Sequence, residues 1–300
     1  MAPQSTSLTD RSPILVTGMP RSGTTWLARL LATGARTALP GREPMNPRGR
    51  QYALSGTLPG WVRLTDPTAK QQRLLRLAYA GINPWTYSRY GSRQWLAWLP
   101  TVRCIVKDPF AMLSIPAVQR VVRARAVLVY RHPGAALASY RRMGWTPDTE
   151  ELVPIVSQFL ATYGPSDGVD LPREGQDDVS SLAWFWNVLY GMALRETTVN
   201  TVDVVSHRDL AIGGEEAARS IFRVLDLTWT KASQGLIRPT GVRDSDEQAL
   251  HNLNRDPASV ADSWRGRLAE PDVRRLEEET AQVRHALEQR SQWHVRQSRP

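Results

Sequence analysis

The chain has 300 residues, of which 41% are hydrophobic and 22% are charged, and its mean hydropathy is −0.38. This composition is typical of a globular domain and excludes collagen, a disordered chain and a membrane-embedded body. A net charge of +9, from 38 basic and 29 acidic residues, favours anionic partners such as phosphorylated cofactors, polyanionic glycans or nucleic acid.

The compartment is predicted from three features. No apolar run approaches the roughly 20 residues that a membrane-spanning helix needs, and the opening residues MAPQSTSLTDRSP are polar where a signal peptide is apolar. Cys104 is the single cysteine, so the chain can form neither an internal disulfide nor a cysteine-ligated zinc site by itself. We expect a cytoplasmic protein without a membrane span.

Residues 1–11 are predicted to be disordered, and residues 12–300 to form one α/β domain. Four short apolar segments are predicted as buried strands: Ile14 to Thr17, Arg103 to Lys107, Ala126 to Tyr130 and Val202 to Val205. A helix follows the first strand, with Leu27, Leu30 and Leu31 on one face, and ends near Gly34. This order predicts a central parallel sheet, doubly wound, with ligand sites at the carboxyl ends of its strands.

Two segments depart from this alternation. Residues 40–100 and 144–181 are rich in Pro, Gly and polar residues, and we expect them to cover the working edge of the sheet and to form the acceptor pocket. The last third returns to helices. One carries Ala217, Ala218, Ile221, Phe222 and Leu225 on a single face, and another opens at Pro271 and carries Val273, Leu276, Val283 and Leu287.

The segment from Gly18 to Trp26, GMPRSGTTW, lies between the first strand and the first helix. Two glycines five residues apart allow a nest of backbone N–H groups, and the helix N-terminus adds a partial positive charge, so an anion is expected there. The spacing is that of a P-loop, but Thr24 occupies the position of the P-loop lysine and the cation is Arg21 instead. A loop for a 5′-phosphate without a metal fits this pattern better; the alternative is an ordinary strand-to-helix turn.

Pro20 to Trp26 resembles the 5′-phosphosulfate loop of the sulfotransferases that use 3′-phosphoadenosine 5′-phosphosulfate (PAPS). Their second signature, a strand ending in Arg with a Ser eight residues later, resembles Arg131 and Ser139. The resemblance implies the P-loop-like, three-layer α/β/α fold of that family. It also implies that Arg131 and Ser139 bind the 3′-phosphate of PAPS.

The resemblance also assigns roles within the loop. Arg21 would bind the bridging and sulfonate oxygens, and the backbone and hydroxyl groups of Ser22, Gly23, Thr24 and Thr25 would bind the 5′-phosphate. Trp26 would either stack on adenine or pack in the core.

The catalytic base must reach the hydroxyl of the acceptor. Phenol and steroid sulfotransferases use a His after a Lys-Thr motif, but this chain reads Lys107-Asp108-Pro109 there. It resembles instead the carbohydrate and bacterial branches, in which a Glu after the second strand of the family's own fold is the base. In this chain the segment from Thr37 to Pro44 supplies that residue as Glu43. Lys107 would stabilise the transferred group. The alternatives are that Glu43 pairs with Arg42 and that Lys107 pairs with Asp108.

Three further segments match the family loosely. The turn after the fourth predicted strand reads His207-Arg208-Asp209-Leu210, where the family has Tyr-Glu-Asp-Leu. The basic C-terminal loop corresponds to residues 255–265, in which Arg255 or Arg265 could contact the 3′-phosphate. His132 follows Arg131, and we expect it to cap a helix rather than to act as the base.

The sequence therefore predicts an O-sulfotransferase that converts PAPS to adenosine 3′,5′-bisphosphate without a metal. The acceptor is expected to be a small molecule with a hydroxyl group, such as a bacterial secondary metabolite or a glycoside, because eleven tryptophans favour an aromatic-lined pocket. The alternatives are a P-loop kinase of a small substrate, against which Thr24 argues, and a non-catalytic protein that binds polyanions. No nucleic-acid-binding motif is evident.

Overall fold

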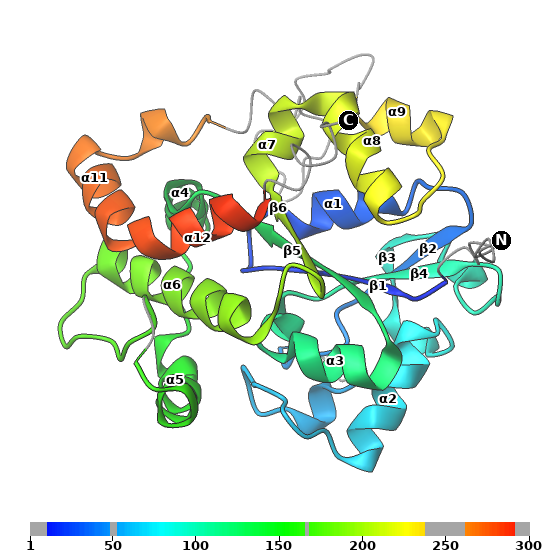
Figure 1. Ribbon diagram of the computed structural model, residues 1–300, viewed down its shortest axis with the longest axis horizontal. Helices are drawn as coiled ribbons and strands as arrows, with labels where there is room; N and C mark the ends of the chain where they lie inside the picture. Colours follow the sequence, from blue (N-terminus) through cyan, green and yellow to red (C-terminus); the bar gives the residue numbers. More distant parts are fainter. Residues whose placement is uncertain (1–10, 49–52, 166–167, 238–261, 292–300) are drawn as a thin grey trace, which may run out of the picture.

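The computed structural model describes residues 11–48, 53–165, 168–237 and 262–291. Its centre is a sheet with the strand order β3-β2-β4-β1-β5-β6 (Figure 1). The strands are β1 (Ile14–Thr17), β2 (Thr37–Gly41), β3 (Tyr87–Ser92), β4 (Arg103–Lys107), β5 (Arg125–Tyr130) and β6 (Val202–Ser206). Neighbouring strands run parallel except at the edge, where β3 is antiparallel to β2.

The helices fall into two layers, one on each face of the sheet (Figure 1). One layer contains α1 (Thr24–Leu31), α7 (His207–Ile212), α8 (Gly214–Val224) and α9 (Lys231–Ile237). The other contains α2 (Ala69–Tyr79), α3 (Ile115–Val122), α4 (Pro133–Met143), α5 (Thr149–Tyr163), α6 (Asp178–Glu196), α11 (Glu270–Glu279) and α12 (Ala281–Ser291). Short 3₁₀ helices are η1 (Ser55–Thr57), η2 (Pro84–Thr86), η3 (Gln94–Leu96), η4 (Pro109–Ser114) and η5 (Arg265–Arg267).

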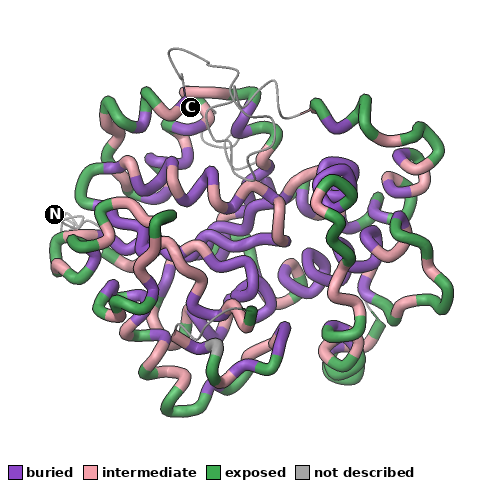
Figure 2. Tube along the Cα trace, turned by 180° about the vertical axis from the view of Figure 1, so that it is seen from behind, coloured by how far each residue is buried: buried purple, intermediate pink, exposed green. Residues whose placement is uncertain are grey.

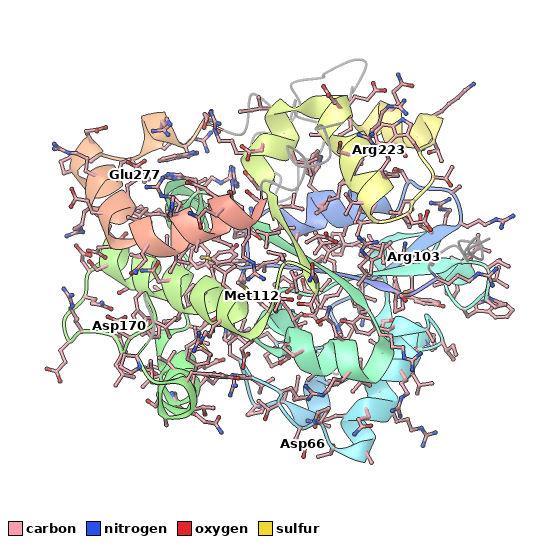
Figure 3. All side chains as sticks on the ribbon, in the orientation of Figure 1. Asp66, Arg103, Met112, Asp170, Arg223 and Glu277 are labelled. Carbon is pink, nitrogen blue, oxygen red and sulfur yellow. The ribbon has the colours of Figure 1, made fainter. Side chains whose placement is uncertain are left out.

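The apolar core lies on both faces of the sheet, and the central strands are buried except at Lys107, which ends β4, and Arg125, which begins β5 (Figure 2). Ile14 and Val16 of β1 face α1 and α8, whereas Leu15 faces the layer of α3 and α6. Met112, labelled in Figure 3, belongs to that second layer. The strands read as continuous apolar runs because side chains on both faces of a parallel sheet are covered by helices.

The predicted fold class is confirmed, and so are the four predicted strands, to within one residue at their ends. The antiparallel strand β3 was not predicted, because it lies in the segment 40–100, whose pattern is weak. The single helix predicted after Pro271 is wrong. Two helices, α11 and α12, meet at the buried Thr280, whose hydroxyl donates a hydrogen bond to the carbonyl of Leu276 (2.7 Å). The predicted disorder of residues 1–11 falls outside the described residues, apart from Arg11.

The register of the sheet determines where the predicted site residues lie. Val16 of β1 pairs with Lys107 of β4, and Thr17 pairs with Leu128 of β5. Because these strands are parallel, the residues that follow them meet at one edge. The loop after β1, Asp108 after β4 and Arg131 after β5 therefore lie at the same edge of the sheet.

Candidate active site

The loop between β1 and α1 is held against β5 and β6 by two glycines. Gly18 has a φ of 149°, and a Cβ atom there would lie 2.1 Å from the carbonyl oxygen of Val129 on β5. Gly23 has a φ of 97°, and its Cβ would lie 2.1 Å from Cδ2 of His207 at the start of α7. These close approaches require glycine and fix the path of the backbone past the sheet edge.

The N-terminus of α1 opens towards this edge. Gly23 is its N-cap residue, no side chain caps it, and its first turn contains no acidic residue. The first N–H groups of a helix have no acceptor within the helix, and its dipole is positive at this end. The backbone from Gly23 to Trp26 can therefore bind an anion, as the sequence predicts.

Arginines gather beside this helix end. The Nε–H of Arg21 donates to the hydroxyl of Ser139 on α4 (3.0 Å), so the structure brings together two of the predicted site residues. The buried Nε of Arg131 has no hydrogen-bond partner among the described residues. Burial, followed by the charges of Arg21, Arg142 and Arg267, lowers the pKa of Arg131 to about 10.

Arg142 and Arg267 were not predicted as site residues. Arg142 is near the end of α4, and Arg267 ends η5, so neither is close in sequence to the loop between β1 and α1. None of the four arginines forms an ion pair with a carboxylate in the described part of the chain. Four arginines without a carboxylate partner in the described ranges concentrate positive charge, which favours an anion that carries several charges.

Glu43 and Lys107 lie on the other side of the same edge, after β2 and at the end of β4. Their side chains form an ion pair with each other, and the amide of Asn46 donates to the second carboxylate oxygen of Glu43. Both side chains retain contact with solvent, at 17% and 16% exposed. The structure thus unites the two predicted catalytic residues at a position that a substrate can reach.

Asp108 supports this pair from inside the protein, a role that the sequence did not predict. Its buried carboxylate accepts hydrogen bonds from the backbone N–H groups of Met45 (2.6 Å) and Phe110 (3.1 Å). Burial and the nearby charge of Glu43 raise the pKa of Asp108 to about 8. The side chain ties the loop that carries Glu43 to the end of β4.

A sequence model described as the sulfotransferase family matches residues 13–231, which is more than half of the chain. The chain belongs to the sulfotransferase family. No curated protein matches the sequence.

Solved structures of sulfotransferases resemble the chain over most of its length. The sulfotransferase domain of the Synechococcus PCC 7002 olefin synthase is 16% identical, with a TM-score of 0.47, and the match covers 93% of this chain and 98% of that one. The domain from the curacin biosynthetic pathway is 12% identical, with a TM-score of 0.47 and coverage of 91% and 99%. Sulfotransferase STF1 from Mycobacterium tuberculosis H37Rv is 16% identical, with a TM-score of 0.40 and coverage of 91% and 77%. At these TM-scores the likenesses add nothing to the family match.

Trp26 of this sulfotransferase packs in the apolar layer between the sheet and α8, where only 9% of it is exposed. Its ring makes an edge contact with His207, at 5.7 Å between centroids. This matches the core alternative, and stacking on adenine stays a prediction. Burial and the charge of Arg131 lower the pKa of His207 to about 3, so its imidazole is neutral at pH 7.

His132 caps α4, as predicted, because its Nδ1 accepts a hydrogen bond from the N–H of Gly134 (3.2 Å). Its ring stacks on Trp264, at 4.6 Å between centroids. The guanidinium of Arg265 lies over the same tryptophan, and its charge contributes to lowering the pKa of His132. The charge of Arg267 contributes instead to lowering the pKa of Arg131. A contact of Arg265 with the 3′-phosphate stays a prediction, and Arg255 lies outside the described residues.

A cleft of about 580 Å³ lies between α4, α5 and the start of α6, and Trp145 lines it together with Tyr140, Asp148, Glu151 and Ser181. The guanidinium of Arg21 lies over the Trp145 ring, 5.8 Å from its centroid, which places the cleft next to the phosphate loop. The lining comes largely from the segment 144–181, the expected cover of the working edge.

None of the described helices combines the length and the apolar character that a bilayer crossing requires. No group of three or more metal-binding His, Cys, Asp or Glu side chains occurs within the described ranges.

Proposed function

We propose that this sulfotransferase transfers the sulfonate group of PAPS to a hydroxyl group of a small molecule and releases adenosine 3′,5′-bisphosphate. The observation that carries the proposal is the group of four arginines, Arg21, Arg131, Arg142 and Arg267, which have no carboxylate partner among the described residues and of which Arg21 precedes the open N-terminus of α1. A donor with a 5′-phosphosulfate and a 3′-phosphate carries several negative charges on two separate groups. The chain offers two cationic positions at one edge of the sheet. Arg21 lies in the loop after β1, and Arg131 follows the end of β5.

The residues present fit such a donor. The unpaired Nε of Arg131 is a buried hydrogen-bond donor that a phosphate oxygen would satisfy, and an unsatisfied buried donor costs about 1–3 kcal/mol. Arg131, Ser139 and Arg267 would bind the 3′-phosphate. The N–H groups from Ser22 to Thr25 would bind the 5′-phosphate by the same attraction that operates at other helix N-termini.

The transfer forms a bond from the acceptor oxygen to sulfur while the bond from sulfur to the 5′-phosphate oxygen breaks. Glu43 accepts the proton of the acceptor hydroxyl as that oxygen attacks. The ammonium of Lys107 has three N–H donors, so it can keep Glu43 in place and also bond to an oxygen of the transferred group. Arg21 neutralises the negative charge that develops on the leaving phosphate.

The cleft at Trp145 is the proposed acceptor site. It combines aromatic rings with polar side chains and is large enough for a small molecule. These properties fit a partly polar acceptor, such as a bacterial secondary metabolite or a glycoside. We also propose the cytoplasm as the compartment, in line with the buried thiol of Cys104, whose pKa burial raises to about 12.

Calorimetric titration with adenosine 3′,5′-bisphosphate, and separately with ATP plus magnesium, tests the donor. We expect binding of the bisphosphate that chelators do not alter. Binding of ATP with magnesium alone would overturn the proposal in favour of a kinase. A salt-dependent affinity for any polyanion, without preference for the bisphosphate, would favour the non-catalytic alternative.

A further inference from the structure

The edge of the sheet at β3 carries an exposed apolar surface that the proposed reaction does not use. It consists of Ile82, Trp95, Leu96 and Trp98, called here the β3 face. Trp95 is 70% exposed, Trp98 58% and Ile82 57%. Large apolar side chains that gather on a surface mark a binding site more often than single ones do.

The four residues are neighbours in space although they belong to different turns. The ring of Tyr87 on β3 contacts Trp95 edge-on, at 5.1 Å between centroids, and its hydroxyl donates to the carbonyl of Gly81 (2.6 Å). A Cβ on Gly81 would lie 2.6 Å from the backbone of Ala97. Tyr87 therefore joins the turn that carries Ile82 to the turn that carries the two tryptophans.

The charge around the β3 face has one sign. Residues 67–107 contain no Asp or Glu but seven Lys and Arg residues. Four of these are exposed on α2 and β3: Lys70, Arg73, Arg76 and Arg89. The guanidinium of Arg93 instead donates to the carbonyls of Ala32 and Gly34 and to the hydroxyl of Thr37. Within the described residues none of the four pairs with a carboxylate, so the surface complements an anionic partner.

We propose that the β3 face docks this protein on the surface of an anionic lipid bilayer. Tryptophan rings favour the boundary between headgroups and acyl chains, and arginines and lysines near them are attracted to anionic headgroups. Aliphatic side chains such as Ile82 and Leu96 gain free energy from an apolar layer, whereas a glycan offers them none. The combination of aliphatic, aromatic and basic side chains therefore selects a membrane surface.

Docking at this face would bring the loop of the proposed base close to the headgroups. Gly41 of β2 pairs with Tyr87 of β3, and the N–H of Arg42 donates to the carbonyl of Thr86 (2.9 Å). Glu43 is the next residue. The docking surface and the catalytic edge are thus joined by two paired strands, although the proposal does not depend on the reaction.

Sedimentation of the full chain with phospholipid vesicles tests the proposal. We expect binding to vesicles of equal parts phosphatidylcholine and phosphatidylglycerol but not to vesicles of phosphatidylcholine alone. Replacing Trp95 and Trp98 together with Ala should weaken binding about tenfold or more, because two interfacial anchors are lost. The control is a Leu171→Ala, Val199→Ala double variant, which removes exposed apolar side chains elsewhere and should bind normally.

A second variant guards against misfolding at the β3 face. Arg73→Glu with Arg76→Glu changes only the exposed surface of α2, and it should also weaken binding to the anionic vesicles. Failure of the wild type to bind anionic vesicles would overturn the proposal, and so would undiminished binding of the tryptophan variant. A wild-type dimer in sedimentation velocity that the tryptophan variant abolishes, without vesicle binding, would assign the face to a second copy instead.

Discussion

In the proposed function Arg131 recognises the 3′-phosphate, because its guanidinium is buried near other arginines and its Nε has no partner among the described residues. Arg131→Ala should weaken binding of adenosine 3′,5′-bisphosphate by about 10- to 100-fold, the range for loss of charge-assisted hydrogen bonds. Binding of adenosine 5′-phosphate should change much less. Calorimetry measures both affinities, and Arg219→Ala, on the remote helix α8, is the control. Equal losses for the two nucleotides would remove Arg131 from the 3′-phosphate site.

Glu43 carries the proton transfer in the proposed mechanism. Glu43→Gln keeps the size of the side chain but removes its basicity, and kcat should fall by about 10² or more while donor affinity stays near normal. Steady-state rates with an accepted substrate, and calorimetry with the bisphosphate, give the two quantities. Glu174→Gln, at an exposed position, should leave both unchanged. An undiminished kcat in Glu43→Gln would mean that another group is the base.

Asp108 should make stability depend on pH. Its pKa is raised from 3.8 to about 8, so the folded protein holds a proton that the unfolded chain releases. Stability from this group is complete below pH 3.8 and is lost as the pH rises towards 8. Asp108→Asn removes that loss. Its melting temperature relative to the wild type should therefore be higher at pH 9 than at pH 5.

Thermal unfolding monitored by circular dichroism at the two pH values measures this difference. Asp66→Asn changes an exposed side chain, and its melting temperature relative to the wild type should be the same at both pH values. If the difference between Asp108→Asn and the wild type is the same at both pH values, Asp108 ionises normally in the folded protein.

At the scale of elements, the turn from β1 into α1 depends on the contact between Gly23 and His207. Gly23→Ala adds a Cβ atom 2.1 Å from a buried imidazole, at a φ of 97° that side chains rarely adopt. We expect a loss of stability of about 1–3 kcal/mol and at least tenfold weaker nucleotide binding, because the N–H groups of α1 are displaced.

Gly144→Ala is the matched control, since Gly144 also has a positive φ (61°) but nothing lies near its Cβ position. It should cost about 1 kcal/mol from the backbone alone and leave binding intact. Combining Gly23→Ala with His207→Ala should restore part of the stability. Denaturant titration measures each variant, and no rescue would mean that the backbone conformation, rather than the contact, is limiting.

At the scale of the whole molecule, two kinds of ion pair link elements that are distant in the sequence. Arg63, which precedes α2, pairs with Glu196 at the end of α6, and these side chains are only 6% and 8% exposed. Arg141 on α4 pairs with Asp178 and Asp272 on α6 and α11, in contact with water. Screening by water makes the second kind much weaker than the first.

Arg63→Met should therefore lower the free energy of unfolding by about 3 kcal/mol or more, since it removes the cationic partner of the buried Glu196 carboxylate and leaves it bonded to the neutral hydroxyl of Tyr163 (3.1 Å). Arg141→Met should cost about 1 kcal/mol or less. Urea unfolding compares the two variants directly. Similar losses would show that Glu196 reaches water when Arg63 is removed.

Local sequence determined the parts of this protein that depend on neighbouring residues. The strands β1, β4, β5 and β6 were predictable because a strand covered on both faces must be apolar throughout. The tight turn from β1 into α1 was predictable because its glycines and its helix start lie within nine residues, and the resemblance to the family rested on this loop together with Arg131 and Ser139.

Only the tertiary structure decided which distant residues meet. The charges of Arg142 and Arg267 act on Arg131, and Asp108 bonds to the loop of Glu43, across segments that no local pattern connects. The edge strand β3 and its exposed tryptophans were not predictable either, because a strand half open to solvent has no continuous apolar run. Periodicity reports the burial of a side chain but not its partner. The electrostatics of the site, which depend on distances between charges, therefore came from the fold.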